Sequence, residues 1–200
     1  MKRTLAILLV MLLCCATCTV AQAQEGSTYT HEGTIPYALD YPAGWIPLSE
    51  ETRNAILAYG TGMLKDAELS EILAQMKSYE MAMLFHGATG ANVALLTQPA
   101  PGITTSMFAM MGPTMVSSLR TQLPGVDGIG EPTVVTVGEI EYLLISYQIT
   151  LQGEVTVGLQ AYTVLGENMF IITFGALADT VDMEEMDVAV ERMLGSLRLL

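Results

Sequence analysis

The chain has 200 residues, of which 8 are Lys or Arg and 21 are Asp or Glu, so its formal net charge at pH 7 is −13. This excess of carboxylates argues against binding to nucleic acid and to anionic membrane surfaces, because Lys and Arg neutralise the charge of both. The charge has two explanations, which are solubility and the attraction of a basic partner or a cation.

The first 23 residues have the pattern of a signal peptide for export. Lys2 and Arg3 precede an apolar run, residues 5–13, that is too short to cross a bilayer. A small-x-small cleavage pattern ends at Ala23, so we expect the mature chain to begin at Gln24. The protein is therefore expected to be secreted or to reside in the cell envelope, with a mature chain that does not span the membrane.

All three cysteines, Cys14, Cys15 and Cys18, lie within this signal. Lipidation of a cysteine is the alternative to cleavage at Ala23, although the residues before Cys18 make a poor lipobox. A cleaved chain contains no cysteine, and this excludes disulfides, a thiolate metal site and a cysteine nucleophile. Its length is enough for one domain of ordinary size, which the core alone must hold together.

The polar residues 24–33 predict a flexible leader before a single domain over residues 34–200. Ser49 is a candidate N-cap for a helix, and apolar residues at helical spacing predict a second helix further on. The elements expected up to residue 98 are a strand at 35–41, a turn at 42–45, helices at 52–59 and 67–79, and a hairpin of strands at 81–85 and 92–98.

A methionine-rich helix is expected to begin at Thr104 or Thr105 and to end before Pro124. Pro113 removes a backbone donor and clashes one turn back, so it should kink or divide this helix. Residues 126–130 are expected to form a loop that leads into the next strands.

The centre of the fold is predicted to be a meander of strands between residues 131 and 176. Apolar and polar side chains alternate over 142–151 and again over 155–165, and β-branched residues with intervening Gly turns favour antiparallel pairing. A strand at 169–176 follows, and then an acidic-capped helix that ends at Gly195. The predicted fold class is α+β, with an antiparallel β-sheet of about six to seven strands whose apolar face needs a cover.

Two segments resemble the PsbP-like family, the extrinsic lumenal proteins of photosystem II and their secreted bacterial relatives of unknown function. They are residues 37–45, where a strand enters a Pro-x-Gly-Trp turn, and residues 162–197, where a late strand pair leads into the acidic-capped helix. The resemblance spans nearly all of 34–200 and implies an antiparallel sheet sandwiched by helices, an α/β/α arrangement. It transfers no catalytic residue, and the photosystem role is not carried over because the features it depends on have no match here.

Candidate catalytic and metal-binding residues are few. His31 lies in the leader and His86 at a hairpin turn, whereas a zinc site needs three or four ligands and a serine hydrolase needs a nucleophile elbow. We therefore expect no catalytic residue, no cofactor and no metal ligand. One acidic cluster lacks the register of a calcium loop, and helix capping explains most of it: Asp179, Asp182, Glu184, Glu185 and Asp187.

Methionine is unusually frequent, and four of these residues lie within two helical turns: Met107, Met110, Met111 and Met115. Thioethers suit Cu(I), but methionine also fills irregular cores. We favour the core interpretation because this helix must cover the sheet. Exposed methionines would instead indicate an adaptable binding surface.

A stripe of polar side chains on two neighbouring strands is the best candidate for a binding surface. The simpler interpretation is a solvated sheet face, and the stripe becomes a shallow binding surface only if the covering helices leave it open. Its members are Ser146, Gln148, Thr150, Thr156, Gln160 and Tyr162.

The leading functional hypothesis is an exported, non-catalytic α+β module that binds or assembles with another extracytoplasmic protein. The alternative, from a different class, is a small-molecule or metal (Cu or Ca) binding protein of the cell envelope. A secreted hydrolase is the third possibility, and no motif favours it.

Overall fold

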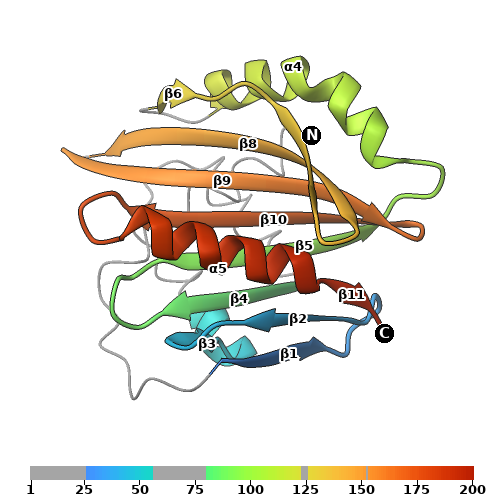
Figure 1. Ribbon diagram of the computed structural model, residues 1–200, viewed down its shortest axis with the longest axis horizontal. Helices are drawn as coiled ribbons and strands as arrows, with labels where there is room; N and C mark the ends of the chain where they lie inside the picture. Colours follow the sequence, from blue (N-terminus) through green and yellow to red (C-terminus); the bar gives the residue numbers. More distant parts are fainter. Residues whose placement is uncertain (1–25, 56–79, 123–125, 152) are drawn as a thin grey trace.

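The computed structural model describes residues 26–55, 80–122, 126–151 and 153–200. Its centre is an antiparallel sheet of eight strands in the spatial order β3-β4-β5-β10-β9-β8-β6, with β7 also paired to β8 (Figure 1). The strands are β3 (Trp45–Pro47), β4 (Met81–His86), β5 (Asn92–Pro99), β6 (Val126–Ile129), β7 (Thr133–Val137), β8 (Ile140–Leu151), β9 (Glu154–Leu165) and β10 (Asn168–Leu177).

A second, three-stranded sheet joins segments from the two ends of the chain. Strand β2 (Tyr37–Tyr41) lies between β1 (Ser27–His31) and the short β11 (Arg198–Leu199), and both pairings are antiparallel. Its apolar side chains, including Tyr37 and Leu39, share a buried cluster with Leu84 and Phe170 of the large sheet. The second sheet therefore closes the part of the core that lies over β4, β5 and β10.

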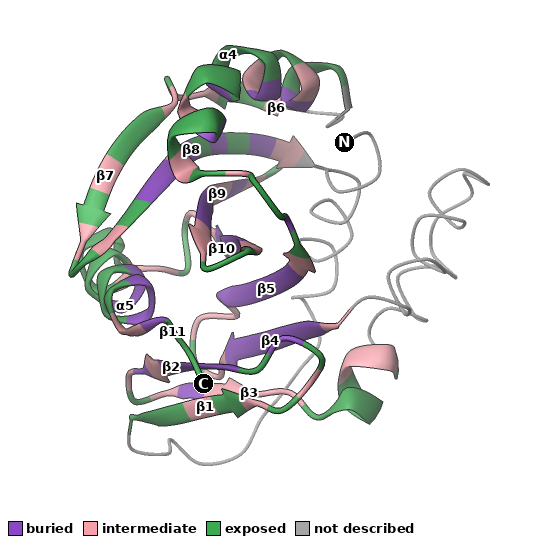
Figure 2. Ribbon diagram, turned by 90° about the vertical axis from the view of Figure 1, so that its right-hand side faces the viewer, coloured by how far each residue is buried: buried purple, intermediate pink, exposed green. Residues whose placement is uncertain are grey.

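Two helices cover opposite faces of the large sheet. Helix α4 (Thr105–Gln122) buries Phe108, Met115 and Leu119 against one face. Helix α5 (Met183–Ser196) buries Ala189, Val190, Met193 and Leu194 against the other. In Figure 1, α4 lies above β8 and α5 crosses in front of β10, and Figure 2 shows the buried side of each helix turned toward the strands. The predicted α+β fold, an antiparallel sheet sandwiched by helices, is confirmed.

The meander of long strands is also confirmed. Strands β8, β9 and β10 pair in sequence order through short turns. Gly153 and Gly166 occupy these turns with φ of 89° and 61°, a backbone conformation that residues with a Cβ rarely adopt. The predicted hairpin of β4 and β5 is present as well.

Several short elements differ from the expectation. Residues 27–31, within the expected loose leader 24–33, form β1. Trp45, the last residue of the expected turn at 42–45, begins the edge strand β3, and residues 126–129, within the loop expected at 126–130, form the edge strand β6. Helix α4 continues through Pro113 without being divided. Residues 50–55 are helical, but the rest of the helix expected at 52–59, the helix at 67–79 and the signal with its cleavage site at Ala23 and Gln24 lie outside the described residues.

Candidate binding surface around helix α5

Helix α5 begins with a well-formed cap. A side-chain oxygen of Asp182 accepts hydrogen bonds from the backbone N–H groups of Glu184, at 2.8 Å, and Glu185, at 3.4 Å. The two glutamates lie in the first turn, where the helix dipole favours negative charge. Helix capping, which the sequence suggested for the acidic cluster, is therefore the role of Asp182.

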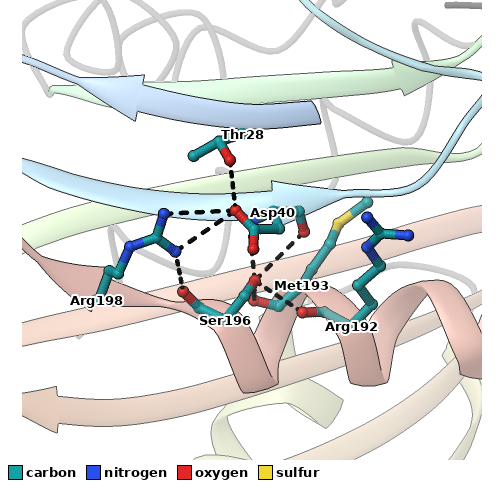
Figure 3. A network of polar contacts seen from close by, with 6 residues as sticks. All are labelled: Thr28, Asp40, Arg192, Met193, Ser196 and Arg198. Atoms are coloured by element: carbon teal, nitrogen blue, oxygen red, sulfur yellow. Dashed lines mark hydrogen bonds and ion pairs between the residues drawn. The ribbon is translucent and has the colours of Figure 1, made fainter. Parts of the chain in front are cut away.

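The C-terminal half of α5 is tied to both sheets. The hydroxyl of Ser196 accepts a hydrogen bond from the backbone N–H of Asp40, at 2.8 Å, and donates to the carbonyl of Arg192. Figure 3 shows how Asp40 also accepts from Thr28, at 2.7 Å, and pairs with Arg198, at 3.5 Å. This network fixes the end of α5 relative to β1, β2 and β11.

The N-terminal half of α5 is much less buried. Met183 and Val188 are large apolar side chains that remain 49% and 65% exposed. Four carboxylate residues surround them, and this half of the helix separates two grooves. The carboxylates are those of Asp182, Glu184, Glu185 and Asp187.

The first groove, which we call the sheet groove, lies between α5 and the strands β6, β8, β9 and β10. It has a volume of about 460 Å³, within the range of ligand-binding clefts. Its rim includes Ser146, Gln148 and Asp187, whereas its other side chains are mostly apolar. These are Ile129, Val157, Leu159, Phe174, Met183, Met186 and Val190.

The second groove, the tryptophan groove, lies on the other side of α5 and has a volume of about 410 Å³. It is lined by Trp45 and His86, whose ring centroids are 5.5 Å apart, and by the carboxylate residues of the first turn of α5. His86 is held by a hydrogen bond of 2.8 Å between its Nδ1 and the hydroxyl of Thr89. Met186 lines both grooves, so the two grooves adjoin each other across the N-terminal half of α5.

The six residues of the predicted polar stripe do not share a face. Gln148 pairs with Val157, whereas Thr156 pairs with the fully buried Ile149. Paired residues point to the same side of a sheet, so Ser146, Gln148 and Thr150 face α5. Ser146 and Gln148 are exposed and line the sheet groove, and Thr150 is half-buried.

The other three residues, Thr156, Gln160 and Tyr162, are buried on the face of α4. The hydroxyl of Tyr162 donates a hydrogen bond of 2.6 Å to the side-chain oxygen of Gln160. Burial raises the pKa of Tyr162, so the phenol stays protonated and can donate. This pair satisfies polar groups inside the core and is not available to a ligand.

The two histidines lie on different sheets and have separate partners. On β1, His31 Nε2 is 3.6 Å from a carboxylate oxygen of Glu80, and the His31 ring stacks on Tyr37. Glu80 accepts hydrogen bonds from the backbone N–H and hydroxyl of Thr34, and these bonds lower its pKa. Within the ranges that the structure describes, no three His, Asp or Glu side chains are placed to hold a metal ion.

The sequence had suggested that the methionines of α4 fill the core, but not all of them do. Met115 is buried, but Met107, Met110 and Met111 are 41%, 85% and 37% exposed. The helix turns Phe108, Met115 and Leu119 toward the sheet, and this orientation leaves the other methionines on its outer side.

Comparison with known proteins supports the fold. No family model matches the chain, and no curated protein matches it. A crystal structure from Bacteroides thetaiotaomicron is similar with a TM-score of 0.50 and 10% identity, and it covers 88% of this chain. The match spans only 49% of the Bacteroides protein, so this chain corresponds to about half of that one.

The solution structure of cyanobacterial PsbP from Synechocystis also has a TM-score of 0.50, with 11% identity over 92% of this chain and 98% of that one. LpqN of Mycobacterium tuberculosis, described as involved in cell envelope biogenesis, matches with a TM-score of 0.46 and 14% identity over 88% of this chain and 92% of that one. The resemblance to PsbP noted in the sequence therefore holds at the level of the fold. In the described part of the chain, no helix is long and apolar enough to cross a membrane.

Proposed function

We propose that this protein is an exported, non-catalytic module that binds another extracytoplasmic protein through the N-terminal half of α5 and its two grooves. The observation that carries the proposal is the exposure of Met183 and Val188 between these grooves. Exposed apolar side chains beside apolar clefts are typical of interaction sites, and methionine adapts its shape to a partner. The export signal supports the location.

The charge around this surface favours a partner that carries Lys or Arg next to apolar side chains. Glu184, Glu185 and Asp187 flank the exposed Met183 and Val188, and the whole chain has a net charge of −13. Complementary charge speeds association and fixes the register of an interface. The apolar floor of the sheet groove, with Val157, Leu159 and Phe174, would receive an apolar side chain of the partner.

The separation of potentially reactive groups supports a non-catalytic role. Ser146 lines the sheet groove, whereas His86 lines the tryptophan groove on the other side of α5. A serine nucleophile needs a base within hydrogen-bond reach. The Nδ1 of His86 is occupied by Thr89, so this imidazole is held by its own hairpin.

Site-specific photo-crosslinking in the organism that produces the protein tests the proposal. A photoreactive residue placed at Val188 or at Gln148, both exposed, should give the same discrete protein adduct. A residue placed at the exposed Ser117, on α4 and hence on the opposite face of the sheet, is the control and should not give this adduct. The proposal requires that the captured protein, once purified, binds the wild-type protein directly.

Two results would contradict the proposed surface. One is the absence of an adduct at Val188 and Gln148, and the other is equal capture of the same protein from Ser117. Stabilisation of the purified protein by a small polar ligand, abolished by Gln148→Ala, would instead favour the small-molecule alternative.

A further inference from the structure

Three methionines stand together on the outer side of α4. Met107, Met110 and Met111 are 41%, 85% and 37% exposed, and Met110 is the most exposed large apolar residue in the described part of the chain. A single exposed apolar side chain needs no explanation, but three within one helical turn do. The core on this side is already formed by Phe108, Met115 and Leu119.

Helical spacing brings the three thioethers within reach of one point. Met107 lies three residues before Met110 and four before Met111, and residues at these spacings have Cβ atoms about 5–6 Å apart. The methionine side chain is unbranched and has three rotatable bonds, so its sulfur can move by several ångströms without disturbing the backbone. All three sulfurs can therefore approach a single ion above Met107.

The chemistry of α4 selects a soft ion. The helix contains no Asp, Glu, His or Cys, and its one charged residue is Arg120, in the last turn. Neutral thioethers prefer Cu(I), whereas Ca²⁺ requires oxygen ligands and Zn²⁺ requires thiolate, imidazole or carboxylate. The negative net charge of the chain, −13, favours the approach of any cation.

We propose that Met107, Met110 and Met111 form a surface site that binds one Cu(I) ion through three thioether sulfurs. This site lies on the opposite face of the sheet from α5, so it is independent of the partner surface proposed above. Because the three cysteines lie in the export signal, the exported chain offers no competing thiolate.

The first test uses Ag(I), a redox-stable substitute for Cu(I), and the exported protein with ¹³C-labelled methionine methyl groups. One equivalent of Ag(I) should shift the methyl signals of Met107, Met110 and Met111 and leave that of Met183 in place. Shifts spread over other methionines, or no saturable shift, would overturn the proposal. This measurement uses the unmodified chain, so it does not depend on the folding of any variant.

The second test is competition for Cu(I) against a chromophoric chelator under anaerobic conditions. The triple variant Met107→Leu/Met110→Leu/Met111→Leu should bind Cu(I) more weakly by about tenfold or more, because each leucine keeps the apolar volume but lacks the sulfur. Met183→Leu is the matched control, since it removes an exposed methionine from α5, and it should bind as tightly as the wild type. Equal affinity of the triple variant and the wild type, or equal loss in the control, would refute the site.

Discussion

Two buried tyrosines of β8 differ in whether the hydroxyl has a partner. The hydroxyl of Tyr142 donates a hydrogen bond of 2.7 Å to the carbonyl of Leu194, and so it connects β8 to α5. The hydroxyl of Tyr147 is buried on the face of α4 without a hydrogen-bond partner among the described residues. Burial raises the pKa of both phenols, so neither is charged near neutral pH.

The substitution Tyr142→Phe should lower the free energy of unfolding by about 1 kcal/mol, because it removes the bond from β8 and leaves the Leu194 carbonyl with only the longer bond, 3.4 Å, from the backbone N–H of Leu197. Tyr147→Phe should not lower the free energy of unfolding, and should raise it by up to about 1 kcal/mol. The reason is that this substitution removes a buried hydroxyl that makes no hydrogen bond. Urea unfolding of the two variants measures the difference. Equal losses in both would show that the Tyr142 bond does not stabilise the fold.

Glu80 should make stability depend on pH. Hydrogen bonds from Thr34 lower the pKa of Glu80 in the folded protein. A lowered folded-state pKa means that the carboxylate stabilises the fold above the ordinary pKa of glutamate, about 4, and that this contribution disappears as the pH falls through the folded-state pKa.

The variant Glu80→Gln should therefore be less stable than the wild type at pH 7, and the gap should close in acid. The measurement is the melting temperature of both proteins between neutral pH and about pH 3, a range that spans the glutamate pKa. Glu139→Gln, at an exposed turn, is the control. A gap that stays constant with pH would contradict the role given to Glu80.

At the scale of elements, the pairing of β8 with β9 depends on one glycine. Gly158 lies opposite Tyr147, and a Cβ added there would overlap the Tyr147 ring. Gly158→Ala should lower the free energy of unfolding by about 1–3 kcal/mol, the usual cost of overpacking.

The matched control is Gly128→Ala on β6, where an added Cβ meets no atom within 4 Å. It should change stability by less than about 0.5 kcal/mol, as is usual for surface positions. Thermal unfolding distinguishes the two variants. If Gly158→Ala were as stable as Gly128→Ala, the close approach of Tyr147 to Gly158 would be wrong.

The same pair of strands shows what the sequence could predict. Alternation over 142–151 and 155–165 was enough to identify both strands and their antiparallel pairing. The register of β8 against β9 was not predicted, because it depends on the turn between them. Leu151 pairs with Glu154, so residues equally far from this turn share a face of the sheet. Applied to Ser146 and Gln148, this rule places them opposite Leu159 and Val157, not beside Gln160.

The short edge strands had no such signal. Strands β1, β3 and β6 have three to five residues each, which is too short for an alternating pattern to be recognised. Their backbone groups pair because tertiary contacts bring them to the edge of a sheet. For α4, the abundance of methionine indicated an apolar helix, but Phe108, Met115 and Leu119 decide which side is buried.

At the scale of the whole molecule, the two ends of the described chain meet. Strands β1 and β11 both pair with β2, and Asp40 connects them with the end of α5. The α+β fold followed from the strand pattern and from the amphipathic helices, whereas the sandwich of helices around the sheet followed from the resemblance to the PsbP-like family. The grooves beside α5 did not, because they depend on where the helix crosses the sheet, and the sequence contains no signal for that placement.

This arrangement divides the molecule into an anchored side and an open side. The C-terminal half of α5 is fixed by Ser196 and Tyr142, whereas the N-terminal half presents Met183 and Val188 to solvent. A rigid frame with an exposed adaptable edge is suited to recognition, because little order is lost elsewhere on binding.

The most direct test of this account is the affinity of the purified protein for the partner captured through Val188. The variant Glu184→Lys/Asp187→Lys should weaken binding by about tenfold or more, because it reverses two charges of the proposed interface. Glu139→Lys/Glu167→Lys makes the same change in net charge at exposed turns and should leave the affinity unchanged. Equal weakening by both variants, or none by the first, would contradict the assignment of the partner surface to α5.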